Sequence, residues 1–193
     1  MSQPIVIDKF GGSVLRRPED IAAAVEVVVE QRRAGLQPVV VVSAFEGVTD
    51  TILSAATVLL PDGGLSLREP RQAADSPLAR ETDRALATGE ALSAALFALG
   101  LQARGIPARS FSGAEAGIRT AAAHLGAEVR RVYSRPLRLA LAGDLVPVVA
   151  GSRGSAAMAS SPRSGAAGPT CRLSSWPWRC ARIVASSSRT PVG

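Results

Sequence analysis

The hydrophobic positions of the first 150 residues alternate between short continuous runs and longer stretches with helical spacing. The runs PIVID (residues 4–8) and PVVVV (residues 38–42) are rich in β-branched residues, and the second has the unbroken apolar character of a strand covered on both faces. Two more strands are predicted, at residues 108–111 and in LVPVVAG (residues 145–151), together with a short element around residues 130–133.

Helical spacing follows each of the first two runs. Pro18 suits the first position of a helix, and Gly35 ends that helix. Thr49 is expected to cap a second helix, which continues to Leu59.

A longer helical pattern extends over residues 78–104, after a polar loop expected at residues 61–76. Thr88-Gly89 is predicted to break this helix and Gly105 to end it, and a last helix is predicted at residues 135–142. Strands separated by helices indicate an α/β domain with a parallel or mostly parallel sheet and helices on both faces.

The net charge of +6 is unevenly distributed along the 193 residues. Residues 1–150 carry sixteen acids and sixteen bases, whereas residues 151–193 carry six Arg and no acid. The high isoelectric point is therefore no argument that the folded part binds nucleic acid, and nucleic acid is not an expected partner.

The chain shows no signal for membranes or export. Charged residues interrupt its apolar stretches before they reach the roughly 18 residues of a membrane span. The first residues, MSQPIVID, have neither a basic segment nor an apolar core like that of a signal peptide. The expected location is the cytoplasm, with no membrane partner.

Candidate chemistry gathers where the first two predicted strands end. Lys9, the only lysine among twenty-two basic residues, precedes Gly11, Gly12 and Ser13, and glycines let a backbone approach a phosphate closely. The second strand leads into SAFEGVTD, which offers the hydroxyls of Ser43 and Thr49. Two such loops could face one small anionic substrate, although a Gly-Gly turn is more often purely structural.

Four blocks of the sequence resemble the aspartokinases, members of the amino acid kinase family, in order and approximate spacing. They are KFGGSV, VVVVSAFEGVTD, LATGEALSAALFALGLQARGIPA and SGAEAGIRT, and the resemblance covers nearly all of residues 3–151. It implies a three-layer sandwich, of which this chain holds the N-terminal half. It also implies transfer of the γ-phosphoryl group of ATP, with Mg²⁺, to the side-chain carboxylate of L-aspartate, at the entry to lysine, threonine and methionine synthesis.

The resemblance assigns roles to individual residues. Lys9 would stabilise the charge of the transferring phosphoryl group, and Gly11, Gly12 and Ser13 would bind phosphates. A second group would bind the amino acid: Ser43, Thr49, and Glu90, which would pair with the substrate's α-ammonium. Arg119 would line the substrate cleft or, equally, serve as a surface residue. The resemblance assigns no metal-ligating residues. Whether the protein forms a homo-oligomer is left open.

The resemblance stops after VPVVAG. Residues 152–193 form an Arg/Ser/Pro-rich tail without acids or sustained periodicity, where an aspartokinase would continue with a motif like Thr-Thr-Leu-Gly-Arg-Gly-Gly-Ser-Asp. Back-translating residues 159–171 with GC-rich codons and shifting the frame gives Thr-Thr-Leu-Gly-Arg-Gly-Gly-Thr-Asp. We therefore expect a domain at residues 1–151 and a disordered or frameshifted tail at residues 152–193.

Three functions are compatible with these observations. The first is an aspartate kinase whose activity is impaired or lost in this chain. The second is another amino acid kinase, such as an acetylglutamate or glutamate kinase. The third is a non-catalytic remnant whose basic tail binds nucleic acid. The affinity of such phosphate-driven binding falls steeply with salt concentration.

Overall fold

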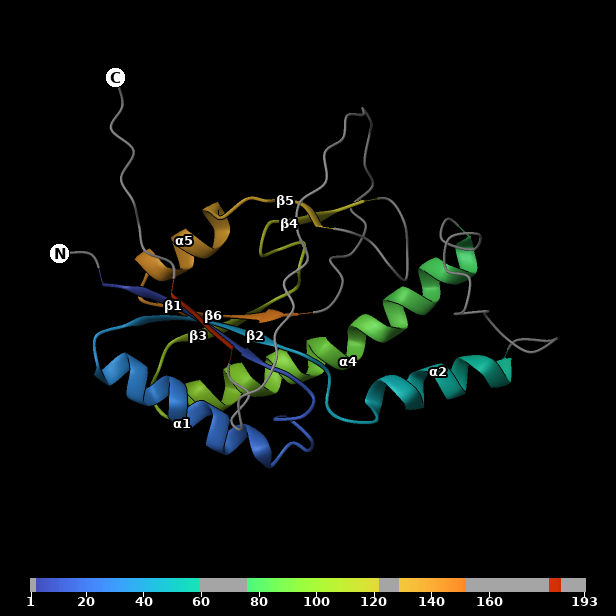
Figure 1. Cartoon of the computed structure of the whole chain (residues 1–193), viewed down its shortest axis with the longest axis horizontal. Helices are drawn as coiled ribbons and strands as arrows, with labels where there is room; N and C mark the ends of the chain where they lie inside the picture. The colour runs from blue at the N-terminus through green and yellow to red at the C-terminus, as the bar shows by residue number, and fades with distance from the viewer. Residues whose placement is uncertain (1–2, 60–75, 122–128, 152–180, 185–193) are drawn as a thin grey trace, which may run out of the picture.

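The structure is a computed structural model that describes residues 3–59, 76–121, 129–151 and 181–184. Its helices and strands alternate through most of the chain, as Figure 1 shows. In chain order they are β1 (Ile5–Phe10), α1 (Asp20–Arg33), β2 (Gln37–Val42), α2 (Val48–Leu59), α4 (Pro77–Gln102), β3 (Ala108–Phe111), β4 (Ile118–Thr120), β5 (Val129–Val132), α5 (Arg135–Ala142), β6 (Val146–Ala150) and β7 (Ala181–Val184).

The main sheet has five strands in the order β3-β6-β2-β1-β7. The first four are mutually parallel, and β7 pairs antiparallel with β1 at the edge. Parallel pairing brings the carboxyl ends of β1, β2, β6 and β3 to the same edge of the sheet. This edge is where ligands bind in open α/β sheets.

Helices α1 and α4 cover one face of this sheet, and α5 with the small antiparallel β4–β5 sheet lies on the other (Figure 1). Alternate residues of each strand supply the two cores, because successive side chains of a strand point to opposite faces. In β2, Val40 and Val42 pack in the core beneath α1 and α4, whereas Val39 packs toward α5. The expected three-layer α/β sandwich with a mostly parallel sheet is confirmed.

The predicted elements are recovered with few exceptions. Helix α4 is continuous through Thr88 and Gly89, so the predicted break is wrong, because the buried face of the helix packs along its whole length. Helix α2 begins at Val48, so Thr49 lies in its first turn and does not cap it. The regular part of α1 begins at Asp20, two residues after Pro18, although Glu19 already has helical angles.

Helix α4 is the longest element, with 26 residues. Ser76 caps its start, since the Ser76 hydroxyl accepts a hydrogen bond from the Ala79 amide at 3.0 Å. By length and composition α4 could also cross a membrane. In the structure, however, Phe97 and Leu101 are completely buried in the core between α4 and the sheet, so α4 is a core helix.

The turn between β3 and β4 contains a glycine that packs against the end of β5. Gly117 has a φ of +84°, and a Cβ there would lie 2.2 Å from the Tyr133 carbonyl oxygen. The Ser112 amide and hydroxyl donate to Glu115, and chiefly the amide bond lowers the pKa of that carboxyl. Only glycine fits where the start of β4 meets the end of β5, so the pairing of these two strands is closely defined.

Most of the tail, residues 152–180 and 185–193, lies outside the described residues, as does the loop expected at residues 61–76 apart from Ser76. Four tail residues form β7 on the free edge of β1. Neither β7 nor β4 was predicted, because β7 lies in a tail without sustained periodicity and β4 has only three residues. The expected disorder of the tail stays a prediction.

Asp8 is the one acidic side chain of β1, and it is 2% exposed among apolar neighbours. Its Oδ2 atom has no hydrogen-bond partner among the described residues. A buried polar atom without a partner costs about 1–3 kcal/mol. Asp8→Val, which keeps a similar volume, is therefore expected to raise the free energy of unfolding by about 1 kcal/mol in urea titrations.

Asp8→Asn is the matched control, because it leaves a polar amide in the same place and should give no such gain. A loss of stability in Asp8→Val would contradict this account, since it would mean that the carboxyl has a stabilising partner.

Candidate functional site

The ends of β1 and β2 are joined by a direct hydrogen bond. The two strands pair in parallel with Lys9 opposite Val41 and Phe10 opposite Val42. One residue further on, the Ser43 amide donates to the Phe10 carbonyl oxygen at 3.1 Å. The loops that follow the two strands therefore leave the sheet side by side.

The first loop turns tightly after Gly11. The Gly11 carbonyl oxygen accepts hydrogen bonds from the amides of Val14 and Leu15, both at 2.9 Å. The amides of Gly12 and Ser13 donate to no described residue. A Cβ on Gly11 would meet nothing within 4 Å, and one on Gly12 only the Ala44 oxygen at 3.6 Å. The loop thus has open space around Gly11 and unused N–H donors, which a phosphate group could occupy.

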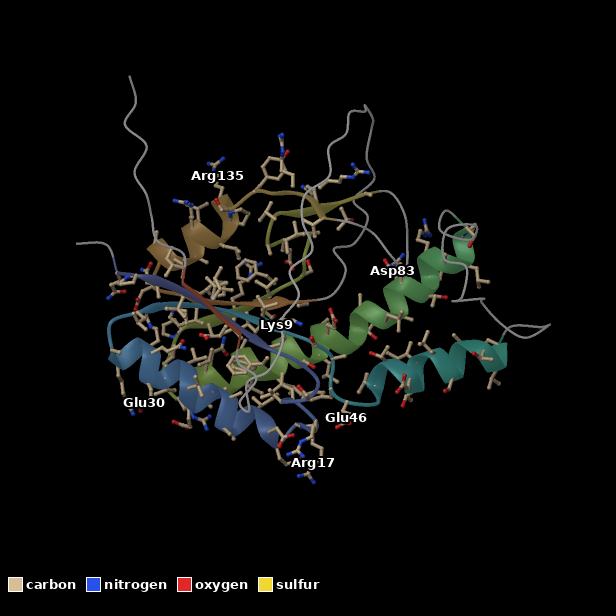
Figure 2. All side chains as sticks on the ribbon, in the orientation of Figure 1. Lys9, Arg17, Glu30, Glu46, Asp83 and Arg135 are labelled. Atoms are coloured by element: carbon tan, nitrogen blue, oxygen red, sulfur yellow. The ribbon has the colours of Figure 1, made fainter. Side chains whose placement is uncertain are left out.

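Lys9 is the cation beside this loop, and it is labelled in Figure 2. Its side chain is exposed, and it forms no ion pair within the described part of the chain. Its neighbours Asp8 and Phe10 are buried beneath α1 and α4. Because successive side chains of a strand point to opposite faces, the Lys9 side chain leaves the sheet on the other face. An exposed ammonium at the end of a parallel strand is available to an anionic ligand.

The second loop, residues 43–47, is tied to both β1 and α2. The Glu46 amide donates to the Leu15 oxygen at 3.3 Å, and Gly47 accepts from the amide and the hydroxyl of Thr51, both at 2.9 Å. Thr49 is exposed in the first turn of α2 and Ser43 is half-buried. The Thr49 hydroxyl makes no hydrogen bond with a described residue, so it is available to a ligand.

Helix α4 reaches the same loop at Gly89. A Cβ on Gly89 would lie 2.9 Å from Val48 Cγ1 and 3.3 Å from Ala44 Cβ, so the helix backbone lies directly against the second loop. The next residue, Glu90, is 6% exposed and interacts within the protein. The sequence suggested a helix break at Gly89. In the structure the glycine instead allows α4 to pack closely against Ala44 and Val48.

The structure thus brings most of the predicted site residues to one edge of the sheet. Lys9, the glycine loop and Ser43 meet through the Ser43–Phe10 hydrogen bond, and Thr49 and Glu90 follow through the packing of Gly89. Lys9 and Glu90 start from opposite faces of the sheet, and the second loop, residues 43–47, connects them.

Arg119 is placed differently from the other predicted residues. It lies in β4, where its neighbour Ile118 packs toward the core and Thr120 is buried, while Arg119 is exposed. Its cross-strand partner is Arg131 of β5. Exposure is compatible with both roles, so the cleft role and the surface role of Arg119 stay predictions.

Gly151 is a residue of this edge that the sequence did not single out. Its amide donates to the Val42 oxygen at 2.7 Å, and a Cβ would lie 2.7 Å from Val41 Cγ1. A glycine directly after a buried strand was the available signal. The described residues contain no group of three His, Cys, Asp or Glu that could hold a metal.

The contact at Gly89 can be tested by enlarging the residue. Gly89→Val should lower the free energy of unfolding by about 1–3 kcal/mol, because the new side chain overlaps Val48 and displaces the second loop. Ala91→Val, at an exposed position of the same helix, is the control for helix propensity. Equal stabilities of the two variants, measured by urea unfolding, would show that the contact is loose.

Known proteins with similar sequences include aspartokinases. The chain is 37% identical to the aspartokinase of Mycolicibacterium smegmatis and 33% identical to the aspartate kinase of Pseudomonas fluorescens, in each case over 150 residues. These alignments cover 78% of this chain, but 32% and 33% of the relatives. The chain therefore spans about a third of the length of these relatives.

Solved structures with the same fold include aspartate kinases. The enzyme from Synechocystis superposes with a TM-score of 0.57 at 34% identity, over 77% of this chain and 22% of that one. E. coli aspartokinase III, in complex with aspartate and ADP, superposes with a TM-score of 0.59 at 20% identity, over 76% and 40%. The profile of the amino acid kinase family matches residues 4–163, and the chain belongs to that family.

Proposed function

We propose that residues 3–151 are the substrate-binding half of an aspartate kinase, which transfers the γ-phosphoryl group of ATP to the side-chain carboxylate of L-aspartate. The observation that carries the proposal is the hydrogen bond from the Ser43 amide to the Phe10 oxygen. It places a lysine-glycine loop and a serine-threonine loop next to each other in a sequence similar to aspartokinases.

The amino acid would bind between the second loop and α4. Glu90 supplies a carboxylate for the α-ammonium group of aspartate, and its neighbour Gly89 lies against that loop. Ser43 and Thr49 supply hydroxyls that donate to the substrate's carboxylates. E. coli aspartokinase III, which has this fold, was solved with aspartate and ADP, the ligand pair proposed here.

The phosphates of ATP would bind along the first loop. The amides of Gly12 and Ser13 donate to no described residue, and the space at Gly11 admits a phosphate group. Lys9 adds a compact positive charge at the end of β1. These features fit a bound phosphate chain, whereas the described residues offer no carboxylate cluster for Mg²⁺, which commonly enters with the phosphates.

In the proposed reaction an oxygen of the aspartate side chain attacks the γ-phosphorus, and the bond from that phosphorus to the bridging β–γ oxygen breaks. Aspartyl phosphate and ADP are the products. Lys9 neutralises charge on the transferring group, while the loop amides and Glu90 hold the two substrates in line. Such a reaction needs positioning and charge stabilisation rather than a covalent intermediate.

We further propose that the reading frame is shifted after residue 151. Residues 152–193 contain no acid, whereas the shifted frame contains the Gly-Arg-Gly-Gly-Thr-Asp sequence of the aspartokinase pattern. A domain that lacks this Arg and Asp lacks groups that would hold and polarise the substrates. Loss of one such group commonly costs about 2.7–4 kcal/mol of transition-state stabilisation.

Restoring the frame within codons 150–160 is expected to give ATP-dependent aspartyl phosphate, trapped as the hydroxamate. The 193-residue chain should give no useful turnover in the same assay. Activity with acetylglutamate or glutamate but not aspartate would favour another amino acid kinase. Brisk turnover by the 193-residue chain would contradict the role proposed for the missing segment.

Lys9→Ala in the frame-restored protein should lower kcat by about 10²–10³-fold, because it removes a charge that acts on the transition state. Arg33→Ala is the control, since Arg33 is an exposed cation at the C-terminal end of α1, which leads to the amino end of β2. Lys9→Arg keeps the charge but shifts its position, and should also lower kcat. Equal kcat values for Lys9→Ala and Arg33→Ala would exclude Lys9 from the reaction.

A further inference from the structure

The arginines of the described residues divide into two groups. Thirteen have described side chains, and eight of these form ion pairs with Asp or Glu. The paired ones are Arg16, Arg17, Arg32, Arg33, Arg80, Arg84, Arg104 and Arg109. The other five have no carboxylate partner within the described part of the chain, and all lie between residues 119 and 138.

These five unpaired arginines share one region of the structure, which we call the arginine face. It comprises Arg119 of β4, Arg130 and Arg131 of β5, and Arg135 and Arg138 of α5. All five are exposed, and residues 117–121 and 129–143 contain no acid. In Figure 2, Arg135 points away from the main sheet on the outer side of α5.

Two of these arginines are held opposite each other. Arg119 and Arg131 are cross-strand partners in the antiparallel β4–β5 pair. Side chains at such positions lie on the same side of the pair, and like charges there are destabilising. The packing of Ile118 and the close approach of Gly117 to Tyr133 hold the strands in this register. The two guanidinium groups therefore form a site where a shared anion would relieve their repulsion.

The arginine face continues onto α5 through residues that keep its charges accessible. Leu137 and Leu141 turn toward the core, while Arg135 and Arg138 stay on the exposed side of the helix. The Arg138 Nε donates to the Ser134 hydroxyl at 3.2 Å, which orients the side chain, and no carboxylate of the described residues pairs with its charge. The positive charges thus extend over two elements instead of converging on one point.

An exposed aromatic ring lies between the two elements. Tyr133 is 50% exposed, and the Arg131 guanidinium carbon lies 5.8 Å from its ring centroid. Proteins that bind single-stranded nucleic acids combine such aromatic platforms with a positive surface that follows the phosphates.

We propose that the arginine face binds the phosphate backbone of single-stranded nucleic acid, with Arg119 and Arg131 sharing one phosphate and Tyr133 stacking on a base. A planar guanidinium donates two parallel hydrogen bonds to a phosphate, which suits this arrangement. An acidic polypeptide would satisfy the charges but would have no base to stack on Tyr133. The exposed ring therefore favours nucleic acid.

This inference is independent of the proposed kinase activity, and it departs from the expectation based on net charge. Residues 1–150 have equal numbers of acids and bases, but the structure uses many of the acids to neutralise arginines elsewhere. The six tail arginines are a separate source of positive charge. The experiment must therefore separate the arginine face from the tail.

The test is binding of a fluorescein-labelled oligo(dT) 20-mer to the full 193-residue chain, followed by anisotropy between 50 and 200 mM KCl. The double substitution Arg119→Gln/Arg131→Gln should weaken binding at least tenfold at 50 mM KCl. It should also lower the slope of log K against log salt by about 0.7, since the two arginines share one phosphate and each phosphate contact with a single strand contributes about 0.7. Tyr133→Leu should weaken binding about fivefold or more.

The matched control is Arg80→Gln/Arg84→Gln. It removes the same charge from the exposed face of α4, where both arginines lie near Glu81, and should change affinity less than twofold. Arg119→Lys/Arg131→Lys should keep most of the salt slope. Urea unfolding checks the fold, and the glutamine pair at positions 119 and 131 should be at least as stable as the parent, because it removes a like-charge pair.

Three results would overturn the proposal. The first is the absence of salt-dependent binding by the parent chain. The second is an equal loss of affinity in the two double glutamine variants, which would assign binding to overall charge or to the tail. The third is tighter binding of polyglutamate of matched charge, insensitive to Tyr133→Leu, which would identify an acidic polypeptide as the partner.

Discussion

The parallel pairing of β1 with β2, extended by the hydrogen bond from the Ser43 amide to the Phe10 oxygen, is the constraint on which the candidate site depends. It fixes the two loops at the carboxyl edge of the sheet, and the packing of Gly89 against Ala44 and Val48 adds α4 to the same edge. Without this arrangement, the lysine, the serine loop and Glu90 would belong to separate parts of the surface.

Much of the fold could be predicted from the sequence, because the buried strands are continuous apolar runs and the helices have clear ends. PVVVV became the central strand β2, and α5 matches its predicted bounds of residues 135–142. Short or context-dependent features could not be predicted. Strand β4 has only three residues. Gly89 looks like a helix break in the sequence, because glycine is a poor helix former, but in the structure it lets a neighbouring loop approach the helix.

The candidate site shows a similar division. Lys9, the glycine loop and Ser43 could be predicted because they directly follow strands, and the carboxyl ends of parallel strands meet at one edge. Thr49 could be predicted as a hydroxyl of the segment after the second strand, whereas Glu90 depended on resemblance to aspartokinases, since it does not adjoin a strand. The distribution of charge over the surface could not be predicted from the sequence, because ion pairs such as Arg104–Glu26 join residues far apart in the chain. Only the structure separates neutralised arginines from unpaired ones.

The central claim is that the second loop and α4 form a site for L-aspartate beside the phosphate-binding first loop. The most direct measurement is an ¹H–¹⁵N NMR titration of the 193-residue chain with L-aspartate, with D-aspartate as the control. The account predicts L-specific chemical-shift changes at the amides of residues 43–47 and 89–90 together, with a single dissociation constant. Saturable changes confined to other residues, or identical responses to the two enantiomers, would contradict it.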